Sequence, residues 1–195
     1  FFEKNERKIT FSMLKHILPE FASKFIWLDS PDLQTEDKTI GIEITEAIAP
    51  ETAQIDGEHA KWRFGKQTEH DKQECKRLIE KNGGTVDTIG ISYPVVNSDM
   101  ELEIFEKALR KKLRILPTYK AKGFAKMGLF IFFNEPPIPF NLETSMTRFA
   151  EIQKDSVDQY DFLFFGYRTG VIGYNFRDMS YQHYPVDQDA FDDMS

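Results

Sequence analysis

Residues 40–45 constrain the fold of this chain more than any other stretch, because their apolar and polar side chains alternate strictly. The stretch reads Ile-Gly-Ile-Glu-Ile-Thr. This two-residue period is typical of a β-strand with one buried face. Glu43 and Thr45 are therefore expected to point to the same side of the strand, away from the isoleucines.

A polar stretch at 34–38 separates this strand from Pro31 and Asp32. It reads Gln-Thr-Glu-Asp-Lys and predicts a hairpin turn. Folding back at this turn brings Asp32 beside the strand that carries Glu43. Two carboxylates on neighbouring strands form a candidate site for a hard cation, since Mg²⁺ prefers carboxylate oxygens and water.

Strands alternate with helices along much of the chain. Apolar spacing predicts a helix over 3–21, and a polar region from Pro50 to Lys81 is expected to hold helices that end at Asn82-Gly83-Gly84. Asp99 is a candidate N-cap for a helix over 100–116, before Pro117. Further strands are predicted at 25–28, 85–93, 127–134, 160–167 and 171–176. This order predicts an α/β fold with a mixed central sheet flanked by helices.

The chain is expected to form one domain over residues 1–186, because it contains no internal repeat and no long linker. The last stretch, 187–195, carries four Asp and is predicted to be a frayed tail.

Cysteine content and hydropathy indicate the cellular compartment in which the protein is expected. Cys75 is the only cysteine among 195 residues, so neither an intrachain disulfide nor a cysteine-based zinc cluster can form. No apolar run approaches the ~20 residues that span a bilayer, and no signal peptide is visible. We therefore expect no membrane contact and a cytoplasmic location.

The net charge of −7 argues against a general nucleic-acid coat protein, but the basic residues are unevenly distributed. Seven basic residues and no acid lie within 110–126. An acidic protein with one basic segment can still contact phosphate locally. The alternative is a solvated helix face followed by a lysine-rich loop. The candidates for contact with a nucleic-acid backbone are Lys111, Lys112, Arg114, Lys120 and Lys122.

The order helix, strand, Pro31-Asp32, turn, and apolar strand with Glu43 resembles the PD-(D/E)XK nuclease superfamily, also called restriction-endonuclease-like. Later, a lysine-rich helix end with a tyrosine at 110–119, before an apolar strand at 129–133, resembles bacterial members. The resemblance implies a restriction-endonuclease-like sheet. It also implies Mg²⁺ or Mn²⁺ held by Asp32 and Glu43, with the Ile44 carbonyl as a further ligand. An early helix often adds another acid, here Glu6, with Glu3 and Glu20 as alternatives.

Thr45 departs from the superfamily pattern, because a lysine is expected at its position. Threonine can orient water but cannot supply a positive charge. Either a lysine on the following helical stretch reaches the site, with Lys61 and Lys66 as candidates, or the site is degenerate and the fold serves as a binding module.

The expected function is metal-dependent hydrolysis of phosphodiester bonds in nucleic acid, with DNA favoured over RNA. Endonuclease and exonuclease action both stay open, and many relatives act as homodimers. The alternatives are a catalytically degenerate immunity or defence-associated module and an enzyme acting on small phosphorylated molecules. Trp62 and Phe64, beside Lys61, Arg63 and Lys66, could stack on bases, although packing against a core is the commoner role of such rings.

Overall fold

The computed structural model describes residues 10, 13–15, 17–19, 24–66, 68–87, 90–94, 97–133, 141–167 and 170–185. The chain divides into two compact units: 1–47 together with 101–195, and 48–100. The sequence did not indicate this division, and a single folding domain over 1–186 stays a prediction. The predicted tail at 187–195 lies outside the described residues.

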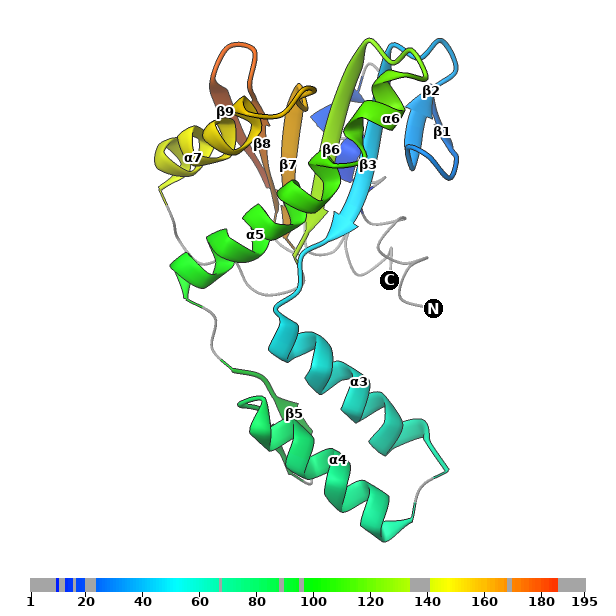
Figure 1. Cartoon of the computed structure of the whole chain (residues 1–195), viewed down its shortest axis with the longest axis vertical. Helices are drawn as coiled ribbons and strands as arrows, with labels where there is room; N and C mark the ends of the chain where they lie inside the picture. The colour runs from blue at the N-terminus through cyan, green and yellow to red at the C-terminus, as the bar shows by residue number, and fades with distance from the viewer. Residues whose placement is uncertain are drawn as a thin grey trace. The chain divides into compact units, whose positions relative to one another are not determined.

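The larger unit is built on one mixed seven-stranded sheet (Figure 1). Its strands, in spatial order, are β1 (Phe25–Trp27), β2 (Leu33–Thr35), β3 (Ile40–Glu46), β6 (Lys126–Phe132), β7 (Phe162–Tyr167), β8 (Gly170–Asn175) and β9 (Ser180–Pro185). The three central strands, β3, β6 and β7, run parallel, whereas all other neighbours are antiparallel. The predicted mixed α/β sheet is therefore confirmed, as is the early hairpin that leads into β3. The turn is shorter than predicted, because Gln34 and Thr35 belong to β2 and Gln34 pairs with Gly41.

Three helices belong to one side of this sheet: α5 (Ser98–Leu113), α6 (Leu116–Lys120) and α7 (Leu142–Lys154). Phe105 of α5 packs against Phe165 of β7, with ring centroids 4.6 Å apart. Phe149 of α7 contacts the same Phe165 ring at 5.0 Å. These aromatic contacts fix α5 and α7 over the central strands, since buried rings dominate the packing free energy of such a core.

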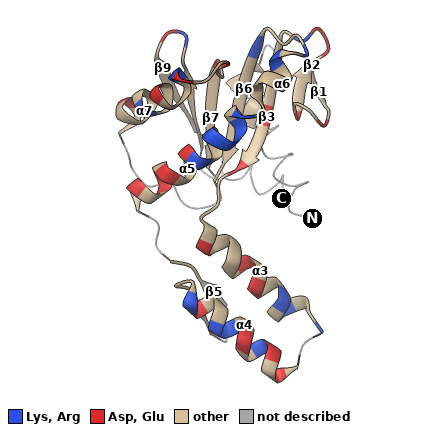
Figure 2. Ribbon diagram, in the orientation of Figure 1, with Lys and Arg blue, Asp and Glu red and all other residues tan. Residues whose placement is uncertain are grey.

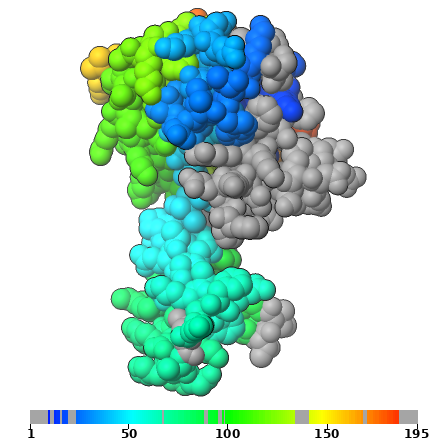
Figure 3. Space-filling view, turned by 90° about the vertical axis from the view of Figure 1, so that its right-hand side faces the viewer, coloured from blue at the N-terminus to red at the C-terminus, as the bar shows by residue number. Residues whose placement is uncertain are grey.

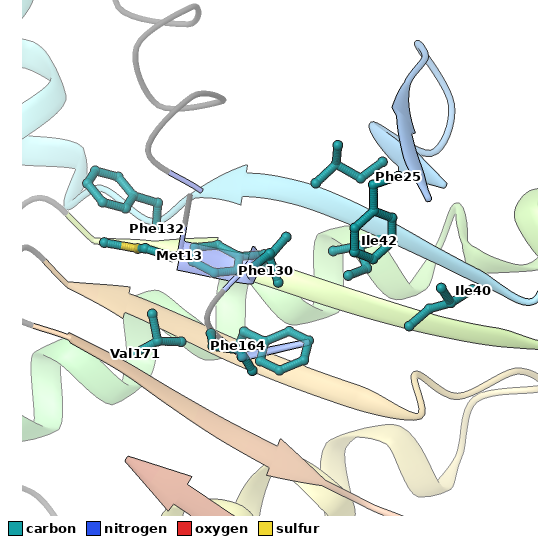
Figure 4. Close-up of a cluster of buried hydrophobic side chains, with 11 residues drawn as sticks. Met13, Phe25, Ile40, Ile42, Phe130, Phe132, Phe164 and Val171 are labelled. Carbon is teal, nitrogen blue, oxygen red and sulfur yellow. The ribbon is translucent and has the colours of Figure 1, made fainter. Parts of the chain in front are cut away.

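A second apolar cluster covers the opposite face (Figure 4). Met13, from the N-terminal segment, lies with Ile42 of β3 and Phe130 of β6 in this cluster. The described residues of the predicted helix 3–21 are mainly helical. Alternation along β3 therefore places Ile42 in a core and Glu43 on the face that α5 and α6 cover.

The smaller unit contains two helices, α3 (Pro50–Phe64) and α4 (Glu69–Lys81), and a hairpin of β4 (Thr85–Val86) and β5 (Ile91–Ser92). Thr68 and Asp71 form a capping box at the start of α4. The chain leaves α4 at Asn82, and Gly83 follows with a φ of 82°, which confirms the predicted helix stop.

Two local predictions were wrong. Residues 85–93 form two short strands rather than one, because Gly90 N donates to Asp87 Oδ1 at 2.8 Å and closes a turn between them. The helix after them begins at Ser98, and its Met100 N donates to Asn97 Oδ1 at 3.0 Å, so Asn97 rather than Asp99 is the capping residue. The edge strand β9 was not predicted.

None of the helices in the described ranges combines the length and apolar character that crossing a bilayer requires.

Candidate metal and phosphodiester site

Asp32 and Glu43 meet on the face of the sheet that α5 and α6 cover. Leu33 pairs with Ile42 between β2 and β3, and one further step of the same register sets Asp32 opposite Glu43. Ile44 N donates to Asp32 Oδ2 at 2.9 Å, which ties the Asp32 side chain to β3. Both acids are buried, with exposures of 7% and 5%. The hairpin thus brings the two predicted carboxylates together.

Gly41 permits this close approach of the Pro31-Asp32 turn to β3. A Cβ atom at Gly41 would lie 2.8 Å from Pro31 Cγ and 2.9 Å from Met127 Sδ. Any larger residue would push the turn away from the strand, since real Cβ contacts are not this short. The glycine in the alternating strand therefore positions Asp32.

Lys112 supplies a positive charge at the two carboxylates. Its Nζ lies 2.5 Å from Glu43 Oε1, and both side chains are largely buried. Within the described part of the chain, Glu43 Oε2 is buried and has no hydrogen-bond partner. A buried carboxylate oxygen without a partner is costly, so this atom is suited to accept a ligand.

Two buried tyrosines border the acids. Burial first, then the nearby Glu43 carboxylate, raise the pKa of Tyr119 well above its usual value, while Ser30 opposes the shift. Tyr160 donates its hydroxyl to Lys112 O at 3.2 Å, and burial followed by the charge of Glu43 raises its pKa as well. Both hydroxyls therefore stay protonated at neutral pH and act as hydrogen-bond donors.

Basic residues surround the turn that precedes Asp32. Lys122 Nζ donates to both Ser30 O and Ser30 Oγ at 2.9 Å and lies 5.6 Å from the centre of the Tyr119 ring. Lys38 Nζ in turn donates to Lys122 O at 2.7 Å. The C-terminal half of α5 and the following α6 carry most of the basic side chains on this side (Figure 2). Figure 3 shows the β1–β2 hairpin beside the α5–α6 segment.

The other predicted residues are placed as follows. Thr45 is half-buried, and its Oγ1 donates to Glu46 O at 3.5 Å. Lys120 pairs with Asp161 at 3.4 Å, whereas Lys111 and Arg114 are exposed at the end of α5. The predicted helix acids lie outside the described residues: Glu6, Glu3 and Glu20.

Lys61 is not the lysine that pairs with Glu43. It belongs to the smaller unit and pairs with Glu58 at 2.6 Å. Lys112, which the sequence suggested only for backbone contact, is the lysine that pairs with Glu43. A signal for this role exists in the sequence: Lys112 follows Phe105 and Ala108 at helical spacing, so it lies on the buried stripe of α5.

The donor set suits a hard cation in part. Two carboxylates lie on paired positions, and one Glu43 oxygen lacks a hydrogen-bond partner among the described residues. This arrangement fits Mg²⁺ or Mn²⁺ bound with water or phosphate oxygens as remaining ligands. Among the described residues, no group of three or more His, Cys, Asp or Glu side chains is arranged to hold a metal alone. Such a site depends on substrate or water to complete the coordination of the cation.

Comparison of the chain with protein-family models, with curated proteins and with solved structures found no match in any of the three.

Proposed function

We propose that the chain is a metal-dependent phosphodiesterase that cleaves nucleic acid, with Asp32, Glu43 and Lys112 as its central residues. The observation that carries the proposal is the Lys112 ammonium, 2.5 Å from Glu43 Oε1, at a pair of buried carboxylates. It supplies the charge that Thr45 cannot. The resemblance to the PD-(D/E)XK superfamily implies two acids and a lysine at one site. Asp32 just before β2, Glu43 on β3 and Lys112 on α5 offer such a set.

Each side chain has a task that follows from its position. Asp32 and Glu43 would hold the cation, with the Ile44 carbonyl as a further ligand. When bound, Mg²⁺ or Mn²⁺ would lower the pKa of a water and offset charge on the phosphate. Lys112 orients the attacking water or neutralises charge that develops on the phosphate. Tyr119 lies near enough to Glu43 for that carboxylate to raise the tyrosine pKa, so its protonated hydroxyl is available to position Glu43. The basic residues on α5 and α6 attract the phosphodiester backbone.

The test is cleavage of labelled single-stranded DNA, duplex DNA and RNA with Mg²⁺ or Mn²⁺. Asp32→Asn and Glu43→Gln are expected to abolish cleavage, and Lys112→Met to reduce kcat by about 10²–10³. Lys111→Met is the matched control for kcat, because it removes an exposed lysine from the adjacent position. Its loss is expected to affect KM for nucleic acid rather than kcat. Full activity in Asp32→Asn that has normal circular dichroism contradicts the proposal.

The same ion pair also favours a second candidate function. Lys112 partly neutralises Glu43, as a structural ion pair would, so the chain would then be a degenerate binding or immunity module. This alternative predicts no metal-dependent cleavage of any of the three substrates and no calorimetric Mn²⁺ binding by wild type. Mn²⁺ binding that disappears in Asp32→Asn/Glu43→Gln supports the phosphodiesterase instead.

A further inference from the structure

The C-terminal end of α3 combines an exposed aromatic ring with positive charge. Between His59 and Thr68 the chain carries three Lys or Arg residues and no acid. Phe64 is 79% exposed, whereas the core is rich in buried Phe. Trp62 is half-buried and stacks on His59, with ring centroids 6.0 Å apart, so this neighbour serves local packing. Packing against the described residues does not account for the exposure of the Phe64 ring.

Positive charge lies against the Phe64 ring and close to it in the chain. The Arg63 guanidinium lies 5.4 Å from the ring centre, and Lys66 follows two residues later on the exposed surface. Lys61 is paired with Glu58 and is less available to a ligand. A helix C-terminus favours cations by itself, but that effect gives no reason for an exposed ring.

We propose that Arg63, Phe64 and Lys66, named here the α3 tip, bind single-stranded nucleic acid. Phe64 stacks on an unpaired base, and Arg63 and Lys66 contact the flanking phosphates. An aromatic ring with adjacent cations matches the two requirements of single-strand binding, a π-face for a base and positive charge for the backbone. A duplex presents base edges rather than base faces, so the ring discriminates against it.

The inference rests on the proposed function, because it names the substrate class for the same enzyme. It specifies strands with unpaired bases, such as single-stranded DNA, rather than intact duplex. The absence of acids between His59 and Thr68 favours a phosphodiester over a protein surface of mixed charge.

The experiment measures fluorescence anisotropy of a labelled oligo-dT of about twenty nucleotides, and of a duplex of equal length, with the full-length protein. Chelator replaces the metal, so that no strand is cleaved. Phe64→Ala and Phe64→Leu are both expected to weaken single-strand binding about 5- to 150-fold. Phe64→Trp is expected to keep wild-type affinity, since it retains a π-face. Val157→Ala changes another exposed apolar side chain and is the control for a general surface effect.

Salt dependence separates the two parts of the α3 tip. Lys66→Ala is expected to lower the magnitude of the slope of log K against log salt by about 0.7, as loss of one phosphate contact does for a single strand. Phe64→Ala is expected to leave this slope unchanged, because stacking releases no counterions.

Wild-type affinity in Phe64→Ala overturns the inference, as does equal weakening by Val157→Ala or wild-type affinity in Phe64→Leu. No binding of the oligonucleotide by wild type also overturns it. A change in self-association on Phe64→Ala, with nucleic-acid binding intact, would assign the ring to a protein contact. Failure of the proposed function has a different signature. With Mg²⁺, either wild type would cleave none of the three substrates or Asp32→Asn would cleave like wild type, whatever happens at Phe64.

Discussion

Lys112→Met removes the ammonium group that Glu43 contacts and leaves the rest of the buried stem in place. Glu43 Oε2 has no hydrogen-bond partner among the described residues, so the variant leaves the whole carboxylate poorly compensated. Removing one partner of a buried ion pair costs about 3–5 kcal/mol. We expect the free energy of unfolding to fall by about 3 kcal/mol, which is the low end of this range. The low end applies because the Lys112 side chain is 16% exposed, so water can reach the space it leaves.

The assay is urea unfolding in a Trp62→Phe background. Trp27 then remains as the only tryptophan, and it reports on the unit that contains Glu43 and Lys112. A loss of about 3 kcal/mol lowers the midpoint by about 1–3 M urea for m-values of about 1–3 kcal/mol/M. The double variant Glu43→Gln/Lys112→Met is expected to recover most of this loss, since no uncompensated charge remains.

The control is Lys111→Met, which should change stability by less than about 0.5 kcal/mol because this lysine is exposed. The reasoning is refuted if Lys112→Met costs no more than Lys111→Met. It is also refuted if the double variant is no more stable than Lys112→Met, because the two charges would then not be coupled in solution.

Buried groups of the same unit give three further predictions. Gly166→Ala should destabilise by about 1–3 kcal/mol in thermal unfolding, since its Cβ would lie 2.5 Å from the Phe130 ring, and an unchanged midpoint would contradict that packing. Tyr119→Phe should weaken Mn²⁺ binding in calorimetry while leaving Lys112 and the fold in place, whereas unchanged affinity would exclude a positioning role for its hydroxyl. Burial raises the pKa of Tyr174 to about 12, so the unfolded chain loses this proton first. The tyrosine contribution to stability should therefore be constant below about pH 10 and fall by about 1.4 kcal/mol per pH unit per raised tyrosine above it. A flat alkaline unfolding profile would refute this.

Prediction from sequence succeeded where short-range patterns decide the structure. The alternation at 40–45 and the polar turn before it specified β3, its hairpin with β2 and the meeting of Asp32 with Glu43. The glycines after Lys81 marked the end of α4. In each case the deciding groups lie within about a dozen residues of one another, so the period of side chains and turn chemistry carry the information.

Prediction failed where a local pattern allowed two answers. The stretch 85–93 has strand composition throughout, but the Asp87 side chain bonds Gly90 N and closes a turn within it. Asn97 and Asp99 are both residue types that cap helices well, and in the structure the Asn97 side chain accepts the hydrogen bond from Met100 N. The charge density of 48–100 gave no sign that this segment forms a compact unit of its own.

The sequence by itself therefore determined a mixed α/β sheet, an acidic pair on adjacent strands and the lack of a lysine beside Glu43 on β3. Only the tertiary structure decided which lysine pairs with Glu43. Glu43 and Lys112 are separated by 69 positions in the chain, and they meet because the parallel pairing of β3 with β6 fixes α5 and α6 over the same face. Such a contact depends on how helices pack on the sheet, and no period in the sequence encodes it directly.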